Sequence, residues 1–375
     1  MKKHIYLLAA FLGLGVGMSQ AQIQKGSLLI KNATVLTVTK GNLESSDVLV
    51  QNGVITQIGK NLSAPAGVTA IDATGKYLMP GIIDAHAHGP YAGDDIIPQQ
   101  NWNLLAHLAL GVTTVHNPSS SAKSAFAAAE YARTDRILGP RIFSTGEIVY
   151  GAKSTSWAPI DNLDDALAHV RRLAAQGAIS VKNYNQPRRE QRQQVIEAAR
   201  QEGLISVAEG GSLYQLDMSM IADGITGIEH NVPTLKMYDD VHQFWRQSGA
   251  GYTPTLVVTY GGLTSEDYFY QNTEVWKHPI LSNFVPPSQL QARSVRRVTA
   301  PEEDYRDDDS AAAAKILMDA GIMVNIGAHG QREGLASHWE MWSFARGGFS
   351  PMEALATATI NPARHLGMDK DIGSL

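Results

Sequence analysis

The 375-residue chain contains no cysteine. Disulfides are therefore excluded in any compartment, and so is a lipid anchor attached through a cysteine. Charged residues make up only 18% of the chain, the formal net charge is −5, and no run of basic residues occurs. Nucleic-acid-binding proteins usually carry a basic patch, so no nucleic-acid partner is expected.

The sequence also lacks an apolar run of the roughly 20 residues that a membrane-spanning helix needs. Its longest apolar segment, Ile5–Met18, follows Lys2 and Lys3 and precedes Ser19-Gln20-Ala21. A short apolar run between basic residues and small residues is typical of a cleaved signal peptide. Residues 1–21 are therefore predicted to be removed, and the mature protein to be periplasmic or secreted, with no membrane contact after cleavage.

Residues 22–78 show short, alternating apolar segments. Asn52-Gly53 lies between Val48–Val50 and Val54–Ile55, and this dipeptide favours a two-residue hairpin turn. The pattern predicts a small β-domain.

From Met79 onward, strand-like apolar runs alternate with alanine-rich helical segments, which is typical of parallel βα units. Eight units fit into residues 79–368, so the fold class is predicted to be α/β, a (β/α)8 TIM barrel. In such barrels the carboxyl ends of the strands form the catalytic face. Polar or titratable residues are expected at or near nearly all of these ends, which are placed near Asp84, His116, Ser144, Lys182, Glu209, His230, Val258 and Ala328.

The segment MPGIIDAHAH, residues 79–88, ends the first predicted barrel strand. Residues two apart on a strand point the same way, so His86 and His88 present two imidazoles to one place. Two histidines do not complete a metal site, and His-x-His also arises by chance. The whole string, however, resembles the metal-binding signature of the amidohydrolase superfamily.

The resemblance continues along the chain. The β-domain before the barrel is similar to the first part of that superfamily's composite sandwich, and residues 369–375 resemble the start of a truncated return to it. The imidazolonepropionase-like and prolidase-like branch is the most similar, especially secreted members often joined to a Tol-type β-propeller. Further similar segments are GVTTV at 111–115, GIEH at 227–230, YTPTL at 252–256 and ATATINPA at 356–363.

The resemblance implies further metal ligands. His230 matches the family's histidine ligand on strand six. Lys182 matches the lysine that reacts with CO₂ to form a carbamate bridging two metal ions. Carbamylation would replace a buried ammonium, which a neighbouring cation disfavours, by an anion with two oxygens. A lysine simply paired with an acid at the barrel mouth remains the alternative.

Two positions differ from the family pattern. Glu209 ends strand five where histidine is usual, and His329 follows strand eight where aspartate is usual. Together the changes preserve the set of donor groups, so they are interpreted as a coupled swap. Glu209 would supply an oxygen ligand, and His329 would be a metal ligand, the catalytic general base, or both. A histidine of ordinary pKa, about 6.5, moves protons near neutral pH.

The implied cofactor is a pair of divalent ions. Zinc fits imidazole and carboxylate ligands best, and manganese or iron would suit the oxygen-rich half. The predicted function is a secreted metal-dependent amidohydrolase that cleaves an amide, dipeptide or cyclic-amide C–N bond by metal-bound hydroxide. The alternatives are a deaminase or lactonase using the same site, and a non-catalytic secreted binding protein derived from the barrel.

The expected substrate is a small peptide-like or amide molecule. Tyr260, assigned to substrate binding, begins a long excursion to Asp309 that either lines the substrate or forms a packed cover. Arg332 is assigned to a substrate carboxylate, with a salt bridge as the alternative. Self-association into a homo-oligomer is left open.

Overall fold

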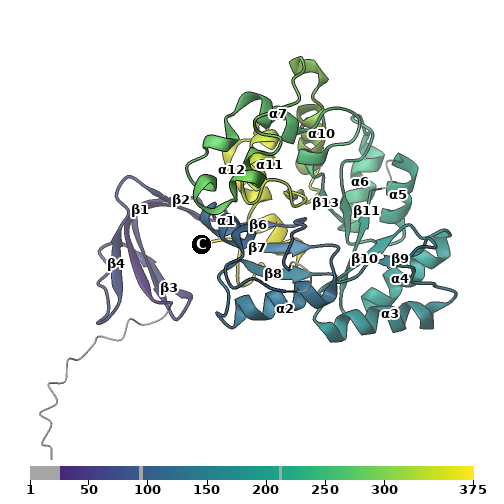
Figure 1. The fold of residues 1–375 in the computed structure, drawn as a ribbon, viewed down its shortest axis with the longest axis horizontal. Coiled ribbons are helices and arrows are strands. Elements are labelled where there is room, and N and C mark those ends of the chain that lie inside the picture. Colours follow the sequence, from purple (N-terminus) through teal and green to yellow (C-terminus); the bar gives the residue numbers. More distant parts are fainter. Residues whose placement is uncertain (1–25, 93–95, 211–212) are drawn as a thin grey trace, which may run out of the picture. The chain divides into compact units, whose positions relative to one another are not determined.

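The computed structural model describes residues 26–92, 96–210 and 213–375, so the predicted signal peptide lies outside the described residues. These residues form two compact units, drawn in Figure 1. The first comprises residues up to 36 together with 42–78, and the second comprises 37–41 together with 79–375. Residues 369–375 group with the second unit, and their predicted return to a sandwich stays a prediction.

The first unit is a small sheet with strand order β3-β2-β1-β4, in which β5 also pairs with β1. Asn52 and Gly53 have φ values of 52° and 80°, as a two-residue hairpin turn between β2 and β3 requires. Leu29, Leu49 and Val68 form its core. The strands are β1 (Leu28–Leu36), β2 (Asn42–Gln51), β3 (Val54–Gly59), β4 (Thr69–Asp72) and β5 (Tyr77–Leu78).

The second unit contains two parallel sheets, of order β6-β7-β8 and β13-β12-β11-β10-β9. Parallel strands joined through helices confirm the predicted α/β class and give a barrel-like unit. The strands are β6 (Ile82–Asp84), β7 (Val112–Asn117), β8 (Arg141–Ser144), β9 (Val149–Tyr150), β10 (Ser180–Tyr184), β11 (Ile205–Glu209), β12 (Gly227–Glu229) and β13 (Gly251–Thr253).

Individual backbone hydrogen bonds connect the two sheets. Asn325 N donates to Tyr252 O at 2.8 Å, and Ala85 N donates to Ile326 O at 3.2 Å, so segment 323–329 lies between β13 and β6. Ile179 N, just before β10, donates to Ser144 O at 3.4 Å. These bonds bring the carboxyl ends of β6, β10, β11 and β12 to the same side of the unit.

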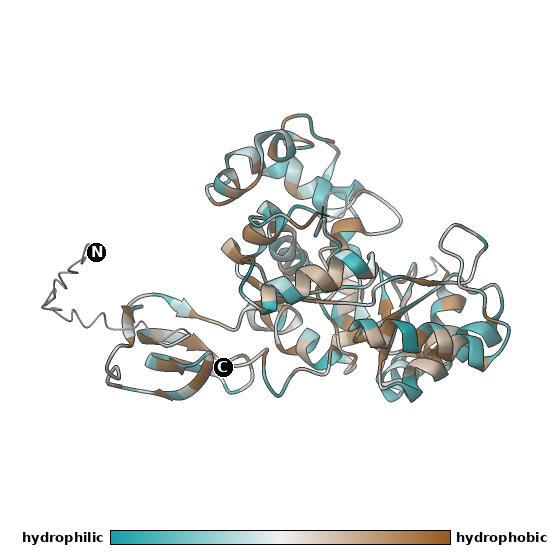
Figure 2. Ribbon diagram, turned by 60° about the horizontal axis from the view of Figure 1, so that its bottom comes forward, coloured by the Kyte–Doolittle hydropathy of each residue, from teal (hydrophilic) through white to brown (hydrophobic). Residues whose placement is uncertain are grey.

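Helix α3 begins and ends as its sequence predicts. In α3, the Asn162 side chain accepts from Asp165 N, and Gly177 ends the helix at φ 109°. Figure 2 shows helices banded in polar and apolar colours, as expected for helices with one buried face. No helix in the described ranges is long and apolar enough to span a membrane. The helices are α1 (Trp102–Ala109), α2 (Ala122–Arg133), α3 (Leu163–Gln176), α4 (Arg189–Gln201), α5 (Tyr214–Ala222), α6 (Asp239–Ser248), α7 (Ser265–Asn272), α8 (Leu281–Phe284), α9 (Pro287–Gln291), α10 (Asp307–Asp319), α11 (Leu335–Arg346), α12 (Pro351–Thr357) and α13 (Ile360–His365).

Two predicted strands differ from the structure. Strand seven was expected to reach Val258, but β13 ends at Thr253 because Pro254 has no N–H for the sheet, and a 3₁₀ turn, η1 (Leu256–Val258), follows. The expected eighth strand is not a regular strand; Val324 forms a single parallel bridge with Tyr252. Segment 323–329 nevertheless delivers His329 to the strand ends.

The long excursion after β13 forms helices α7 to α9 and short 3₁₀ turns, η2 (Val275–Lys277) and η3 (Glu302–Asp304). Phe269 and Tyr270 are buried in a core that also contains Leu335 and Trp339. For these two aromatics the structure therefore agrees with a packed cover rather than a substrate wall.

Candidate metal centre

Four histidines and one carboxylate converge where the barrel strands end. His86 and His88 follow β6, Glu209 ends β11, His230 follows β12, and His329 follows segment 323–328. The ring centroid of His86 lies 4.9 Å from that of His88, 5.0 Å from that of His230 and 5.1 Å from that of His329. The structure thus brings together residues up to 243 positions apart in sequence.

The ligand atoms of these residues form two overlapping groups. One consists of His86, His88 and His329, and the other of Glu209, His230 and His329. Within each group the ligand atoms lie within 4.8 Å of one another, close enough to share one metal ion. Because both groups contain His329, this residue could be a ligand at either candidate ion position.

Protein partners hold the outer nitrogen of three of the rings. His86 Nδ1 lies 2.7 Å from Glu229 Oε2, and His88 Nδ1 lies 3.0 Å from Asn117 Oδ1. His230 Nδ1 lies 2.6 Å from Thr255 Oγ1. Metal-binding histidines typically engage their second nitrogen in this way, which leaves Nε2 for the ion.

The inner nitrogens face one another. His86 Nε2 and His88 Nε2 are 3.1 Å apart. His230 Nε2 lies 2.7 Å from Glu209 Oε1. Imidazole nitrogens and a carboxylate oxygen gathered this closely are the ligand types that zinc prefers.

The backbone at the site is strained. His230, Thr255 and His329 have φ values of 70°, 50° and 58°, in the left-handed region that residues other than glycine rarely adopt. His329 N donates to His86 O at 2.6 Å, which fixes the turn that carries the His329 ring. Such conformations commonly occur where side-chain placement matters for function.

Lys182 is only 1% exposed, and its ammonium group forms an ion pair with Glu209 Oε2. This contact is the simple lysine–acid pair that the sequence left open as the alternative to a carbamate. Burial raises the pKa of Glu209, but the nearby His230 and Lys182 outweigh burial and hold that pKa well below its usual value. Glu209 is therefore an anion.

His86, His88 and His329 are neutral without a metal ion. Burial is the largest cause that lowers the pKa of His86 and His88, with a contribution from the Lys182 charge. Burial and the neighbouring His230 and His88 lower the pKa of His329 to about 3. A neutral ring can bind a metal ion through its free nitrogen, and the choice between metal ligand and general base for His329 stays a prediction.

Two buried acids that are not among the predicted metal ligands support the site. Burial raises the pKa of Glu229 to about 8, although the Lys182 charge opposes this. Burial raises the pKa of Asp84 to about 6, against hydrogen bonds from Ala328 N and the Ser337 hydroxyl. Asp84 also accepts from His86 N at 3.2 Å, so it helps to set the backbone of the first ligand strand.

The two predicted substrate residues differ in their surroundings. Tyr260 has its ring centroid 5.3 Å from that of His230 and, with Glu209, lines a cavity of about 250 Å³. Arg332 instead donates to Tyr270 Oη at 2.8 Å and to the carbonyl oxygens of Gln289 and Ala292. Its role in holding a substrate carboxylate stays a prediction, and these contacts do not favour it.

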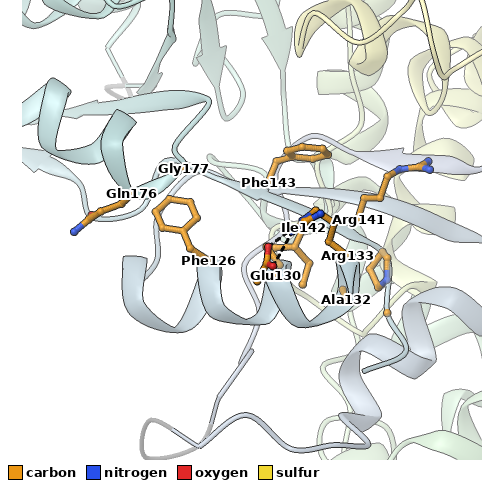
Figure 3. Close-up of a pocket in the computed structure, with 12 residues that line it drawn as sticks. Phe126, Glu130, Ala132, Arg133, Arg141, Ile142, Phe143, Gln176 and Gly177 are labelled. Carbon is orange, nitrogen blue, oxygen red and sulfur yellow. Dashed lines mark hydrogen bonds and ion pairs between the residues drawn. The ribbon is translucent and has the colours of Figure 1, made fainter. Parts of the chain in front are cut away.

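A separate cavity of about 510 Å³ lies away from this site (Figure 3). It is bordered by α2, by the end of α3 and by residues at the start of β8, the opposite end of that strand from the candidate metal centre. Phe126 and Phe143 line it, together with the ion pair between Glu130 and Arg133. None of the predicted site residues lines this cavity.

The sequence pattern of the amidohydrolase family matches residues 77–375. The chain belongs to the amidohydrolase family. A curated relative, a dihydroorotase from Geobacter sulfurreducens, is 29% identical over 213 residues, which are 53% of this chain and 45% of the relative. The chain therefore spans about half the length of the curated relatives it matches.

Solved structures share the fold of this amidohydrolase family member. A Xaa-Pro dipeptidase with bound methionine has a TM-score of 0.68 and 18% identity, over 93% of this chain and 90% of that chain. Phenylurea hydrolase B has a TM-score of 0.69 and 17% identity, over 93% and 89%. Family membership and the convergent histidines confirm that the chain is a metal-binding protein of the amidohydrolase type.

Proposed function

We propose that this chain is a metal-dependent hydrolase that cleaves the C–N bond of a small peptide-like or amide substrate. The observation that supports this best is the shared arrangement of His86, His88 and His230. Each ring has Nδ1 held by a protein group and Nε2 left for an ion. The similar proteins include a dihydroorotase, a dipeptidase and a phenylurea hydrolase, whose names describe hydrolases of C–N bonds.

Two divalent ions are proposed, one at each group of ligand atoms, with zinc the best fit and manganese or iron suited to the oxygen-rich half. When bound, such ions polarise a carbonyl group and make water a better nucleophile near neutral pH. We also propose that Lys182 becomes a carbamate when ions are present, because an ammonium beside two cations is strongly disfavoured. The carbamate would end the direct Lys182–Glu209 ion pair.

The chain's own residues orient the reaction. Glu229, Asn117 and Thr255 fix the direction of the ligand rings, and this limits where a substrate carbonyl group can approach. Tyr260 lies beside His230 at the wall of the cavity that contains Glu209, where it would contact the substrate. Closure of the eight-stranded barrel and export to the periplasm or the medium are parts of the same proposal.

Metal content and turnover test the proposal together. Protein purified without chelator is expected to contain about two equivalents of divalent metal and to hydrolyse members of a panel of dipeptides, cyclic amides and ureas. Labelled ¹³C-bicarbonate should give a carbamate signal that disappears in Lys182→Ala. Turnover only on lactones or aminated heterocycles would assign a lactonase or deaminase, whereas bound metal without turnover on any panel would favour a binding protein.

A further inference from the structure

A second set of buried polar side chains lies inside the barrel-like unit, at the amino-terminal ends of β12 and β13. His365 of α13 is 3% exposed and Asn325 is fully buried. A Cβ atom on Gly251 would lie 2.7 Å from His365 Nδ1 and 3.4 Å from Asn325 Nδ2. A Cβ atom on Gly227 would lie 3.1 Å from His365 Nε2 and 3.3 Å from Glu229 Oε1. The His365 ring therefore packs directly against the two glycines, which have no room for a side chain, and this packing brings it near Asn325 and Glu229.

Neither His365 nor Asn325 has a protein partner for its side-chain polar atoms. Among the described residues, no group forms a hydrogen bond with His365 Nδ1 or Nε2, or with Asn325 Oδ1 or Nδ2. Another buried histidine shows that partners are otherwise supplied: His116 Nδ1 lies 2.9 Å from Ala85 O, and its Nε2 lies 2.7 Å from Ser180 Oγ. Four unpartnered atoms on two neighbouring side chains point to a shared cause.

Ordered water is the usual partner of buried polar groups that protein atoms do not satisfy. Burial lowers the pKa of His365 to about 4, so its ring is neutral near pH 7 and offers one donor and one acceptor. Asn325 adds a donor amide and an acceptor oxygen. A water molecule between these groups and Glu229 would find partners of both kinds.

We propose that ordered water bridges His365 and Asn325 to the carboxyl group of Glu229. His365 is then a positioning residue: it acts through water on Glu229, and Glu229 in turn holds His86 Nδ1. The effect on the metal ion rests on the proposed function. The water bridge itself depends only on the buried polar groups.

The test compares His365→Leu with His107→Leu in the full chain. His107 is a buried histidine of α1 whose Nδ1 is held by Asn103 O at 2.8 Å, so it controls for the loss of a buried imidazole. Zinc affinity is measured by competition with a chromophoric chelator. His365→Leu should weaken zinc binding roughly ten-fold, the lower end of the range for groups that support ligands, while His107→Leu leaves it unchanged. His365→Gln, which keeps a donor and an acceptor, should restore most of the affinity.

Equal zinc affinity in His365→Leu and the unsubstituted protein would overturn the positioning role. A high-resolution crystal structure of the metal-free protein tests the bridge independently, including the case in which the leucine variant does not fold. Water within hydrogen-bonding distance of both His365 and Glu229 would support the bridge, and a dry interior there would refute it. Failure of the unsubstituted protein to bind zinc would refute the proposed function without deciding the bridge.

Discussion

Replacing Glu229 by leucine tests whether the outer contacts of the histidines support metal binding. The carboxyl group is 1% exposed and its Oε2 lies 2.7 Å from His86 Nδ1. Without this contact, His86 Nδ1 would be left buried with no partner, which costs about 1–3 kcal/mol. Losing it should therefore weaken the binding of the ion at His86 by roughly ten- to hundred-fold.

Glu229→Gln keeps a hydrogen-bonding group at this position, since the amide oxygen can still accept from His86 Nδ1. We expect its metal affinity to lie between that of the leucine variant and that of the unsubstituted protein. Affinity is measured by competition titration, and circular dichroism checks folding. Glu266→Gln is the matched control, because Glu266 is equally buried but pairs with Arg293 outside the metal centre. If Glu229→Leu binds the metal within two-fold of the unsubstituted protein, the outer-contact reasoning is wrong.

Three further changes test other parts of the site. His329→Asn should abolish turnover and reduce metal content, since the ring belongs to both ligand groups; full metal content with lost turnover would instead assign His329 to proton transfer. Gly330→Ala should lower metal affinity and destabilise the fold by about 1–3 kcal/mol, because φ at this residue is 80° and a Cβ atom would lie 2.1 Å from His88 O. An unchanged melting temperature and an unchanged affinity would contradict this. Burial raises the pKa of Glu340 to about 8. The stability that protonated Glu340 gives the metal-free protein is fully present below the unfolded pKa, near 4.3, and is lost as pH rises through about 8. Urea unfolding between pH 5 and pH 9 should show this loss in the unsubstituted protein and a smaller one in Glu340→Gln, and identical profiles would refute the assignment.

Much of the metal centre could be predicted from sequence, because the carboxyl ends of the parallel strands in a barrel meet on one face. His86, His88, Glu209 and His230 each lie at or just after the carboxyl end of a parallel strand, and the structure brings them together. His329 arrives at the same place although its segment is not a regular strand. The hydrogen bond from His329 N to His86 O replaces regular sheet pairing there.

Glu229 was missed for a definite physical reason. Successive residues on a strand point to opposite faces, so His230 in the site would place Glu229 outside it. The φ of 70° at His230 breaks this alternation and lets both side chains face the metal centre. Only the Gly-Ile-Glu-His order itself, with an acid directly before the expected ligand, could have suggested Glu229.

The sequence could predict where the site residues lie, but it could not predict which groups surround their side chains. The pKa of His329 falls to about 3 because its ring is buried among His230 and His88, and burial depends on the folded packing. Arg332 likewise lies just after His329 in sequence, yet its guanidinium is held by Tyr270 and by backbone carbonyl groups of the cover. Local sequence gives no indication of those distant partners.

The most direct test of the metal centre is a crystal structure of the zinc-soaked protein with anomalous data collected at the zinc edge. A divalent ion is expected at about 2.0–2.1 Å from Nε2 of His86 and His88, and a second near His230 and Glu209, with His329 within reach of both. Anomalous density absent from the convergence of these side chains, or found only elsewhere on the protein, would contradict the assignment.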